Sequence, residues 1–380
     1  MLDLYIGLMS GTSLDGADGV LVAFDGETLR VLAAATEPFS DAFHAELLAL
    51  NTPAHNELHR AALAGNQVAA VYAKVVAALL AQAAPQGVSP LDIKAIGAHG
   101  QTVRHQPQPQ RTSNDPAGAG YTLQLNNPAL LAELTGITVG ADFRSRDVAA
   151  GGQGAPLVPA FHQGVFGRDD AAVCVLNLGG ISNLSVLPKA AGSPVLGFDC
   201  GPGNALMDAW CRQHTGQPYD AGGAWAASGK LLPALLASLL DEPYFSQPIP
   251  KSTGRDLFSL DWLAGKLQPF AAERPEDIQN TLTEFTARAC ILGVEAYGKG
   301  SESLIVCGGG AFNSHLLARL QAGLPSLRVS TSDEHGLPPL EVEAAAFAWL
   351  ARQLLLGRPG NLPSVTGARG LRVLGAIYPA

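Results

Sequence analysis

The chain has few cysteines, few charged residues and no long uncharged apolar run, and each shortage excludes a class of protein. Five cysteines in 380 residues, an odd number without C-x-x-C spacing, predict neither a disulfide framework nor a zinc site. No window of roughly 18 or more uncharged apolar residues indicates a membrane span. The net charge of −9, from 24 basic and 33 acidic residues, includes no block of like charge, which argues against nucleic acid as a partner.

The first residues also lack the pattern of a secretion signal. Met1 leads directly into a strand-like segment without a basic region, an apolar core or a cleavage site, so we expect a cytoplasmic protein. With 47% hydrophobic and 15% charged residues, the chain has ample apolar surface to bury. Its length fits two domains of roughly 100–200 residues each. We therefore expect a globular protein with a cleft between two domains.

The first half alternates between strand-like and helix-like segments. Short apolar runs that end at turn residues predict strands, and alanine-rich segments with apolar positions three and four apart predict helices. Strands are expected over residues 4–24 (two strands and a turn), 31–35, 93–98 and 137–141, and helices over 57–84 and 128–134. Residues 107–120 and 144–159 are expected to be loops, the second rich in glycine.

The second half begins with a segment that repeats this start. Residues 171–188 again run from strand to small-residue turn to strand. Self-similarity at about half the chain length predicts two related domains. We expect a first α/β domain over 1–165 and a second over 166–380, whose last helix packs back on the first. Further helices are expected over 231–240, 278–297 and 314–320, and a strand over 303–307.

The turn between the first two strands has the composition of a phosphate-binding loop. In the segment Ser10-Gly11-Thr12-Ser13-Leu14-Asp15-Gly16, glycines allow an oxyanion to approach the backbone and hydroxyls donate to it. Asp15, with Asp18 nearby, leaves a carboxylate to hold a cation. Alone, this segment is more typical of an ordinary Asp-Gly hairpin turn.

A second hairpin of the same kind makes phosphate binding the favoured interpretation over an ordinary turn. Asn177, Gly179, Gly180, Ser182 and Asn183 again place small and amide side chains at a strand-turn-strand. These side chains have too little bulk to be explained as core packing. The two turns together indicate two phosphate-binding hairpins.

A glycine triplet, residues 308–310, lies between a predicted strand and a predicted helix. Glycines let a ligand approach, and the helix N-terminus offers free N–H groups to an anion or nucleotide. Asn313 or Ser314 is alternatively a helix N-cap, and a lone triplet is as often a structural turn. Neither a Walker P-loop nor a Rossmann G-x-G-x-x-G occurs in a strand-helix context.

Asp199 lies between an apolar strand, residues 194–198, and a helix opened by Gly201-Pro202-Gly203. A carboxylate at such a strand end often carries chemistry. A helix cap is the alternative, but the intervening proline and glycines make Asn204 the more natural cap. The sequence therefore favours a functional Asp199.

Arginines and acids concentrate in residues 142–147. The planar fork of Arg146 suits a carboxylate or phosphate, although a surface ion-pair cluster explains this loop equally well. The polar residues at or near strand ends, which we interpret as satisfied polar groups or sugar contacts, are His99, Gln101, His105 and His162.

Seven segments together resemble the anhydro-N-acetylmuramic acid kinase family. They are GLMSGTSLDG (7–16), GAHGQT (97–102), ADFRSRDVAAGGQGAPLVP (141–159), NLGGISN (177–183), GFDCGPGN (197–204), KSTGR (251–255) and VCGGGAFN (306–313). The resemblance runs from the first strand to the final LGAIYPA. It departs at Ala98, where the family frequently has serine, and in the loop at 107–120, which is longer than usual.

The resemblance implies an actin-like, hexokinase-like ATPase fold: two α/β domains built on duplicated β-hairpin sheets, with ATP in the cleft. It implies that water opens 1,6-anhydro-N-acetylmuramic acid while O6 is phosphorylated, which gives N-acetylmuramic acid 6-phosphate and ADP. This reaction belongs to peptidoglycan recycling. The family also suggests a homodimer.

That reaction requires a base on water at C1 and a metal ion to neutralise developing charge. Asp199 matches the family's catalytic aspartate, and Mg²⁺ is expected at Asp15 or Asp18 through water. Expected ATP contacts are Gly11, Thr12, Ser13, Leu14, Asp15, Gly16, Ala17 and Asp18 in the first hairpin, Gly179, Gly180 and Ser182 in the second, and Gly308, Gly309, Gly310 and Asn313 in the third motif.

Expected sugar contacts are Arg146, His162 and Glu343. Arg146 would pair with the lactyl carboxylate that distinguishes muramic acid. Glu343 is alternatively a first-turn acid that favours the helix dipole.

Two other functions remain open from the sequence. In a conventional sugar or acyl kinase of the same fold, Asp199 would deprotonate a substrate hydroxyl instead of water. In an actin-like nucleotide switch, closure of the cleft would signal to a partner.

Overall fold

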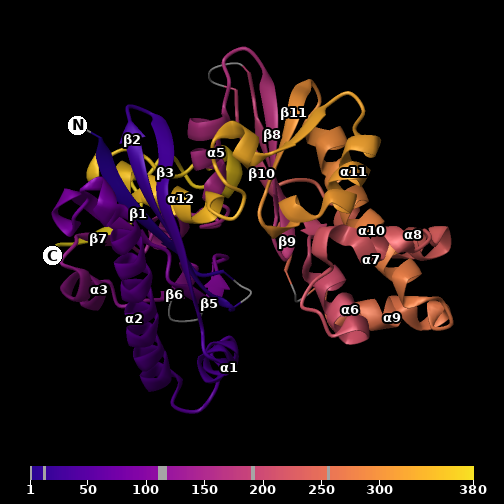
Figure 1. Ribbon diagram of the computed structural model, residues 1–380, viewed down its shortest axis with the longest axis horizontal. Helices are drawn as coiled ribbons and strands as arrows, with labels where there is room; N and C mark the ends of the chain where they lie inside the picture. The colour runs from indigo at the N-terminus through magenta and orange to yellow at the C-terminus, as the bar shows by residue number, and fades with distance from the viewer. Residues whose placement is uncertain (1, 12–13, 110–117, 190–192, 255–256) are drawn as a thin grey trace. The chain divides into compact units, whose positions relative to one another are not determined.

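The computed structural model describes residues 2–11, 14–109, 118–189, 193–254 and 257–380. The chain forms two compact units (Figure 1). The first unit comprises residues 1–165 together with 341–380, and the second comprises residues 166–340. The last 40 residues, from 341 to 380, thus fold with the first unit rather than with the segment that precedes them.

The first unit is built on a mixed sheet with the strand order β13-β7-β4-β1-β2-β3. Its strands are β1 (Asp3–Met9), β2 (Gly16–Asp25), β3 (Thr28–Pro38), β4 (Ile93–Ala98), β7 (Val139–Ala141) and β13 (Ala376–Tyr378). β1, β2 and β3 pair antiparallel, whereas β4 lies parallel to β1 on the other side. A separate two-stranded sheet contains β5 (Gln101–Gln106) and β6 (Tyr121–Leu125).

Helices complete the first unit. They are α1 (Asp41–Ala49), α2 (Glu57–Ala83), α3 (Pro128–Thr135), α4 (Ser145–Ala149), α5 (Val158–Phe166, whose last residue belongs to the second unit), α12 (Val342–Leu355) and α13 (Pro363–Thr366). Gly7 on β1 and Gly97 on β4 allow α12 to lie directly against the sheet, because a Cβ on either would collide with the α12 backbone.

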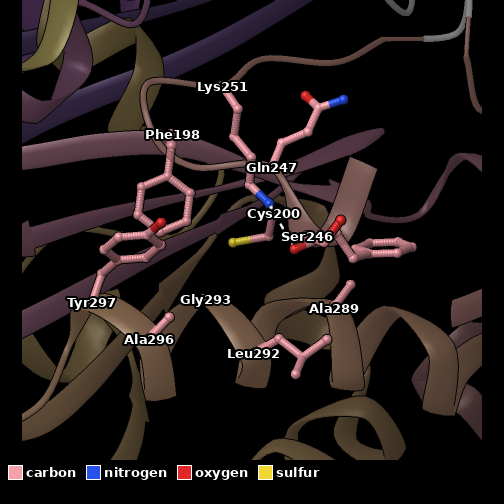
Figure 2. Close-up of a pocket in the computed structure, with 11 residues that line it drawn as sticks. Phe198, Cys200, Ser246, Gln247, Lys251, Ala289, Leu292, Gly293, Ala296 and Tyr297 are labelled. Atoms are coloured by element: carbon pink, nitrogen blue, oxygen red, sulfur yellow. Dashed lines mark hydrogen bonds between the residues drawn. The ribbon is translucent and has the colours of Figure 1, made fainter. Parts of the chain in front are cut away.

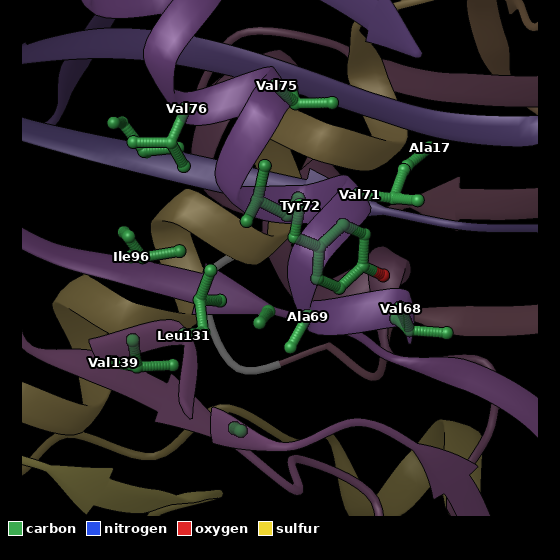
Figure 3. Packing of buried hydrophobic residues seen from close by; sticks show 14 of the residues in the cluster. Ala17, Val68, Ala69, Val71, Tyr72, Val75, Val76, Ile96, Leu131 and Val139 are labelled. Carbon is green, nitrogen blue, oxygen red and sulfur yellow. The ribbon is translucent and has the colours of Figure 1, made fainter. Parts of the chain in front are cut away.

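The long helix α2 packs its apolar face into the core of the first unit. Val68, Tyr72, Val75 and Leu79 recur at helical spacing and are all buried (Figure 3). By length and composition alone, residues 57–86 would also pass as a membrane span. Their buried face lies among residues of the sheet, such as Ile96, as in a core helix.

The second unit repeats the same sheet plan, with the strand order β10-β9-β8-β11-β12. Its strands are β8 (Ala172–Leu178), β9 (Ile181–Leu187), β10 (Leu196–Pro202), β11 (Ser301–Cys307) and β12 (Arg328–Thr331). Its α-helices are α6 (Ala205–Thr215), α7 (Ala224–Ser228), α8 (Pro233–Leu240), α9 (Leu260–Leu267), α10 (Pro275–Tyr297) and α11 (Ser314–Gly323). β8, β9 and β10 pair antiparallel and β11 lies parallel to β8.

The predicted two-domain α/β fold on duplicated hairpin sheets is therefore confirmed. The glycine-rich segment 144–159, expected to be a loop, is an exception: it contains α4 and the first residues of α5. Its glycines suggested irregular structure, but the run of residues 145–149 is free of glycine and closes one helical turn. Of the loop expected at 107–120, residues 110–117 lie outside the described residues.

Candidate functional site

The first hairpin turn joins β1 to β2 and is held from outside by side chains. Gln101 Nε2 donates to the carbonyl of Gly11 at 3.0 Å, and His44 Nδ1 lies 2.7 Å from the carbonyl of Leu14. Leu14 has a φ of 60°, a left-handed conformation that is uncommon for a residue with a side chain. Thr12 and Ser13 lie outside the described residues. The turn is thus held in an unusual backbone conformation by residues distant in sequence.

Ser10 anchors this turn from within the core. Its hydroxyl is buried, donates to the carbonyl of Gly100 at 3.1 Å, and lies 3.0 Å from the hydroxyl of Tyr72. Tyr72 in turn accepts from the Gly100 N–H at 3.1 Å. Every polar atom of this trio is paired, as a buried network requires.

Arg144 and His99 extend this support. Arg144 donates from Nε to His99 Nε2 at 3.1 Å, and its Nη1 donates to the carbonyl of Gly154 at 2.8 Å. Because His99 Nε2 accepts, His99 is neutral and its Nδ1 donates to the carbonyl of Ser10 at 3.2 Å. Burial and the Arg144 charge hold the pKa of His99 well below its usual range. Burial also lowers the pKa of Arg144 to about 10.

Carboxylates gather beside the first hairpin. Thr36 Oγ1 donates to Asp18 Oδ1 at 2.7 Å. Burial raises the pKa of Asp18, and the charge of Asp15 raises it further. Glu343, in the first turn of α12, also has a pKa raised by burial, which the Arg144 charge opposes and the Asp18 charge reinforces. A cation would relieve the repulsion where the negative charge of one carboxylate raises the pKa of its neighbour.

The other two predicted sugar contacts differ in exposure. Arg146 lies on α4 with its side chain exposed. His162, on α5, is fully buried beside Phe161, and burial lowers its pKa to about 3. In this arrangement His162 is a neutral core residue, whereas Arg146 is accessible to an anion.

The second hairpin turn is tight and is held by backbone. The N–H groups of Gly203 and Asn204 donate to the carbonyls of Gly180 and Gly179 at 2.9 and 2.8 Å. Ser182 is buried and donates to the carbonyl of Gly201 at 3.0 Å, so its hydroxyl supports the hairpin from within. The segment that leads into α6 is therefore fixed to this turn.

Asn204 does not cap α6 as expected. Its side chain makes no capping hydrogen bond, and its Nδ2 donates instead to the carbonyl of Leu178 at 3.0 Å. The tight backbone pairing of residues 203–205 to the hairpin already satisfies the first N–H groups of this helix. The expected cap is thus wrong, and the residue serves the hairpin.

Asp199 lies on β10 opposite Asn183 of β9, directly before an irregularity in strand register. Thr253 N–H donates to its Oδ2 at 3.0 Å, and Tyr244 Oη donates to its main-chain carbonyl at 2.7 Å. Burial raises the pKa of Asp199 to about 6, against the lowering effect of the Thr253 hydrogen bond. A carboxylate with this pKa is ionised at neutral pH yet basic enough to accept a proton.

The third motif lines a cavity of about 300 Å³ in the second unit. The lining residues are Asn204, Asp208, Tyr219, Asp220, Gly222, Gly309, Gly310, Phe312, Asn313 and Leu340. Gly308, with a φ of 79°, turns the chain from β11 into this wall. Asn313 also caps α11 by accepting from Leu316 N–H at 3.0 Å.

This cavity combines exposed apolar side chains with two acids. Tyr219, Phe312 and Leu340 are each about 60% exposed, an unusual fraction for large apolar side chains that line one space. Burial raises the pKa of Asp208 to about 6, and the charge of Asp220 adds to that shift. Flat apolar surface with hydrogen-bond acceptors suits a nucleoside.

The sequence missed several of these residues. Tyr244, Thr253 and Arg144 lie far along the chain from the groups they contact, and Asp208 and Asp220 stand in no motif. Arg144 lies two positions before Arg146, the predicted sugar contact, and only its tertiary contact with His99 distinguishes the two. The described part of the chain contains no group of three or more His, Cys, Asp or Glu residues placed to hold a metal ion.

The chain is similar to known proteins over its whole length. The family model described as Anhydro-N-acetylmuramic acid kinase matches residues 3–380. A curated protein of that name from Albidiferax ferrireducens is 63% identical over 398 aligned residues, which cover 100% of both chains. Another, from Variovorax paradoxus, is 63% identical over 381 residues and covers 100% of this chain and 99% of the relative.

Similarity to solved structures is more distant. Component A of (R)-2-hydroxyglutaryl-CoA dehydratase from Acidaminococcus fermentans is 11% identical, with a TM-score of 0.47, and covers 91% of this chain and 98% of that one.

Proposed function

Because this chain belongs to the anhydro-N-acetylmuramic acid kinase family, we propose that it uses ATP and water to convert 1,6-anhydro-N-acetylmuramic acid into N-acetylmuramic acid 6-phosphate and ADP. The water oxygen bonds to C1, the C1–O6 bond breaks, and O6 takes the γ-phosphoryl group. The chain is a phosphotransferase that acts on an alcohol group. We place the reaction in the cytoplasm, in peptidoglycan recycling.

The proposed mechanism rests on the hydrogen bond and the raised pKa of the Asp199 carboxylate. In the proposed step, its carboxylate takes a proton from the water that attacks C1. A pKa of about 6 suits this task, because a base is most effective when its pKa lies near the working pH. The Thr253 N–H fixes one carboxylate oxygen, which leaves the other for the water.

The two hairpins and the third motif support an ATP site. The turns at Gly11 and at Gly179-Gly180, which are partly exposed or exposed, would meet the β- and γ-phosphates with their backbone N–H groups, with Ser182 supporting its turn from within. The cavity at Gly309 and Gly310 would hold adenosine.

Mg²⁺ fits the carboxylates of the first hairpin. The charge of Asp15 raises the pKa of Asp18, and two carboxylates are fewer than the ligands of an all-protein cage. Mg²⁺ in kinases typically keeps several waters and takes one or two carboxylates plus substrate phosphates. Asp18 and Asp15 would hold the ion through water, where it would neutralise charge on the phosphates.

We propose different roles for the three residues that the sequence predicts as sugar contacts. Exposed Arg146 would pair with the lactyl carboxylate, since its fork matches a carboxylate in two parallel hydrogen bonds. Glu343 would accept from a sugar hydroxyl beside Arg144. His162 would act only through packing, because it is fully buried. A homodimer remains a proposal from the family.

Oxygen tracing tests this function directly. The reaction is run in ¹⁸O-labelled water and the product is read by mass spectrometry before the anomeric hydroxyl exchanges with solvent. We expect one labelled oxygen at C1 and none in the phosphate. Turnover without label at C1 would indicate a conventional kinase, and ATP hydrolysis that needs no sugar would indicate a nucleotide switch. Comparing the anhydrosugar with other sugars, by ADP release, identifies the acceptor.

A further inference from the structure

A second cavity, of about 200 Å³, lies behind β10 in the second unit (Figure 2). It is larger than the engineered cavity of roughly 150 Å³ that binds benzene in another protein. Phe198 and Cys200 of β10 line it, so Asp199, the residue between them, belongs to the opposite face of the strand. This cavity is therefore separate from the space that the carboxylate of Asp199 faces.

The residues that line this cavity favour a ligand with a negatively charged group. Among the residues that the structure describes, Lys251 is the one charged residue in this lining, and no acidic side chain belongs to it. The remaining lining residues are Phe198, Cys200, Phe245, Ser246, Gln247, Ala289, Leu292, Gly293, Ala296 and Tyr297. Figure 2 shows the Lys251 amine reaching toward Cys200 and Ser246, with Ala289, Leu292 and Ala296 of α10 on the facing side. An anionic group beside an apolar body would match both parts.

The ammonium group of Lys251 forms no salt bridge with an acid among the described residues. Its Nζ donates to the carbonyls of Tyr244 and Phe245 at 3.2 and 3.4 Å and lies 4.6 Å from the centre of the Tyr244 ring. Both hydrogen bonds are longer than the roughly 2.7–2.9 Å of an ammonium-carboxylate bond. Burial also lowers the pKa of this amine, an effect that an anionic partner would reverse.

The same loop holds Asp199. Lys251 accepts the Asp199 N–H at its own carbonyl, 3.2 Å away, and Tyr244 donates to the Asp199 carbonyl. Thr253, two residues later, donates to the carboxylate. A ligand that draws Lys251 away from the Tyr244 and Phe245 carbonyls would therefore disturb the segment that orients Asp199.

We propose that this cavity is a second ligand site, specific for a small carboxylate with an apolar body, and that its occupancy slows turnover through the loop that holds Asp199. The binding half stands on the cavity alone. The coupling half rests on the proposed role of Asp199.

Benzoate is a suitable probe, with benzyl alcohol as its neutral counterpart. Binding is measured by calorimetry on the full chain without ATP or sugar. We expect benzoate to bind at least about tenfold tighter than the alcohol and Lys251→Met to remove that preference, because a hydrogen bond to a charged group is worth about ten- to hundredfold. The absence of benzoate binding at millimolar concentrations, or equal binding of the alcohol, would overturn the site.

Lys266 provides a matched control. It also donates to a carbonyl, that of Ser238, and lies over an aromatic ring, that of Trp262, but it does not line this cavity. Lys266→Met should bind benzoate as the unmodified chain does. Ala296→Leu, at an exposed position of the lining, should weaken binding without disturbing the fold. Equal affinity in Lys251→Met or in Ala296→Leu would contradict the assignment even if one variant proved unstable.

The coupling is read from turnover at saturating ATP and sugar. Benzoate should lower kcat in the unmodified chain and leave kcat of Lys251→Met unchanged. An unchanged kcat with benzoate bound overturns the coupling. A chain that binds benzoate yet turns over no sugar would instead contradict the proposed function, so the two failures are distinguishable.

Discussion

The two hairpins have the same strand plan but are held by different means. The first turn, between β1 and β2, is supported by side chains of Gln101, His44 and Ser10. The second, between β8 and β9, is supported mainly by main-chain N–H groups at the start of α6, and the side chains of Ser182 and Asn204 add bonds to the carbonyls of Gly201 and Leu178. The first also carries carboxylates at Asp15 and Asp18, whereas the second places its carboxylate, Asp199, on the neighbouring strand. Duplication thus preserved the frame while the chemistry diverged.

This difference suggests a division of labour. In the first turn, side chains bond the carbonyls of Gly11 and Leu14, and the turn carries Asp15 and Asp18, which we propose as the acids beside a cation. In the second turn, main-chain N–H groups bond the carbonyls of Gly179 and Gly180, which fixes the turn to the segment that follows β10, the strand of Asp199. Each substitution below alters one of the two hairpins or the carboxylate beside it.

The largest effect is expected from Asp199→Asn. Removing the general base should lower kcat by roughly 10²–10⁴, while ATP affinity measured by calorimetry stays close to normal. Asp170→Asn, which changes a solvent-exposed carboxylate of the same unit, is the control and should keep full activity. Comparable activity in Asp199→Asn would remove this residue from the base role.

The same variant has a stability signature. The folded-state pKa of Asp199, about 6, lies above its ordinary 3.8, so the carboxylate's contribution to stability falls as pH rises between these values. Asp199→Asn should therefore resist urea better than the unmodified chain at pH 7, and this advantage should disappear below about pH 4.

Asp18→Asn tests the chemistry of the first hairpin. If Asp18 holds Mg²⁺ through water, the Mg²⁺ concentration at half-maximal rate should rise by roughly 10–100-fold, the usual cost of an outer-shell change. Asp25→Asn, at the far end of β2, should leave the Mg²⁺ requirement unchanged. An unaltered requirement in Asp18→Asn would assign the ion elsewhere.

Gly203→Ala tests the backbone support of the second hairpin. A Cβ at this position would collide with the carbonyl of Gly179, and forcing an added methyl into such a contact costs about 1–3 kcal/mol of unfolding free energy. Gly265→Ala in α9 is the matched control, because a Cβ there meets nothing within 4 Å. That control should gain up to about 1 kcal/mol. Urea unfolding of both variants provides the measurement.

Ser10→Ala tests the side-chain support of the first hairpin. Gly100 and Tyr72 each lose a partner in the core, which should cost about 1–3 kcal/mol. The Michaelis constant for ATP should rise as the turn loosens. Ser228→Ala, which removes an exposed hydroxyl bonded to the carbonyl of Trp225, should change neither quantity. A stable Ser10→Ala with normal ATP kinetics would show that the side-chain support is dispensable.

The strands and helices of the two units were predictable from the sequence because short local patterns determine them. The helix expected at 57–84 is α2, and the strand expected at 93–98 is β4. Both predictions succeeded because apolar periodicity and flanking turn residues act over a few positions. The family was also recognisable from the sequence, because its motifs are long runs of contiguous residues.

The contacts that tune the site were not predictable in the same way. Tyr244 reaches Asp199 from 45 residues away and Arg144 reaches His99 across another 45. Nothing local distinguishes Arg144 from Arg146, or shows that His162 is buried, because tertiary packing decides both. Ser10 and Ser182 looked like donors for a phosphate, yet their hydroxyls satisfy carbonyls within the fold.

The pH dependence of kcat/KM for the anhydrosugar, at saturating ATP and Mg²⁺, tests the central claim most directly. The base must be ionised to accept a proton, so kcat/KM should fall as pH drops through the pKa of Asp199. We predict an acidic limb centred near pH 6, the value to which burial raises that pKa. A limb near pH 4, where an ordinary aspartate titrates, would contradict the account.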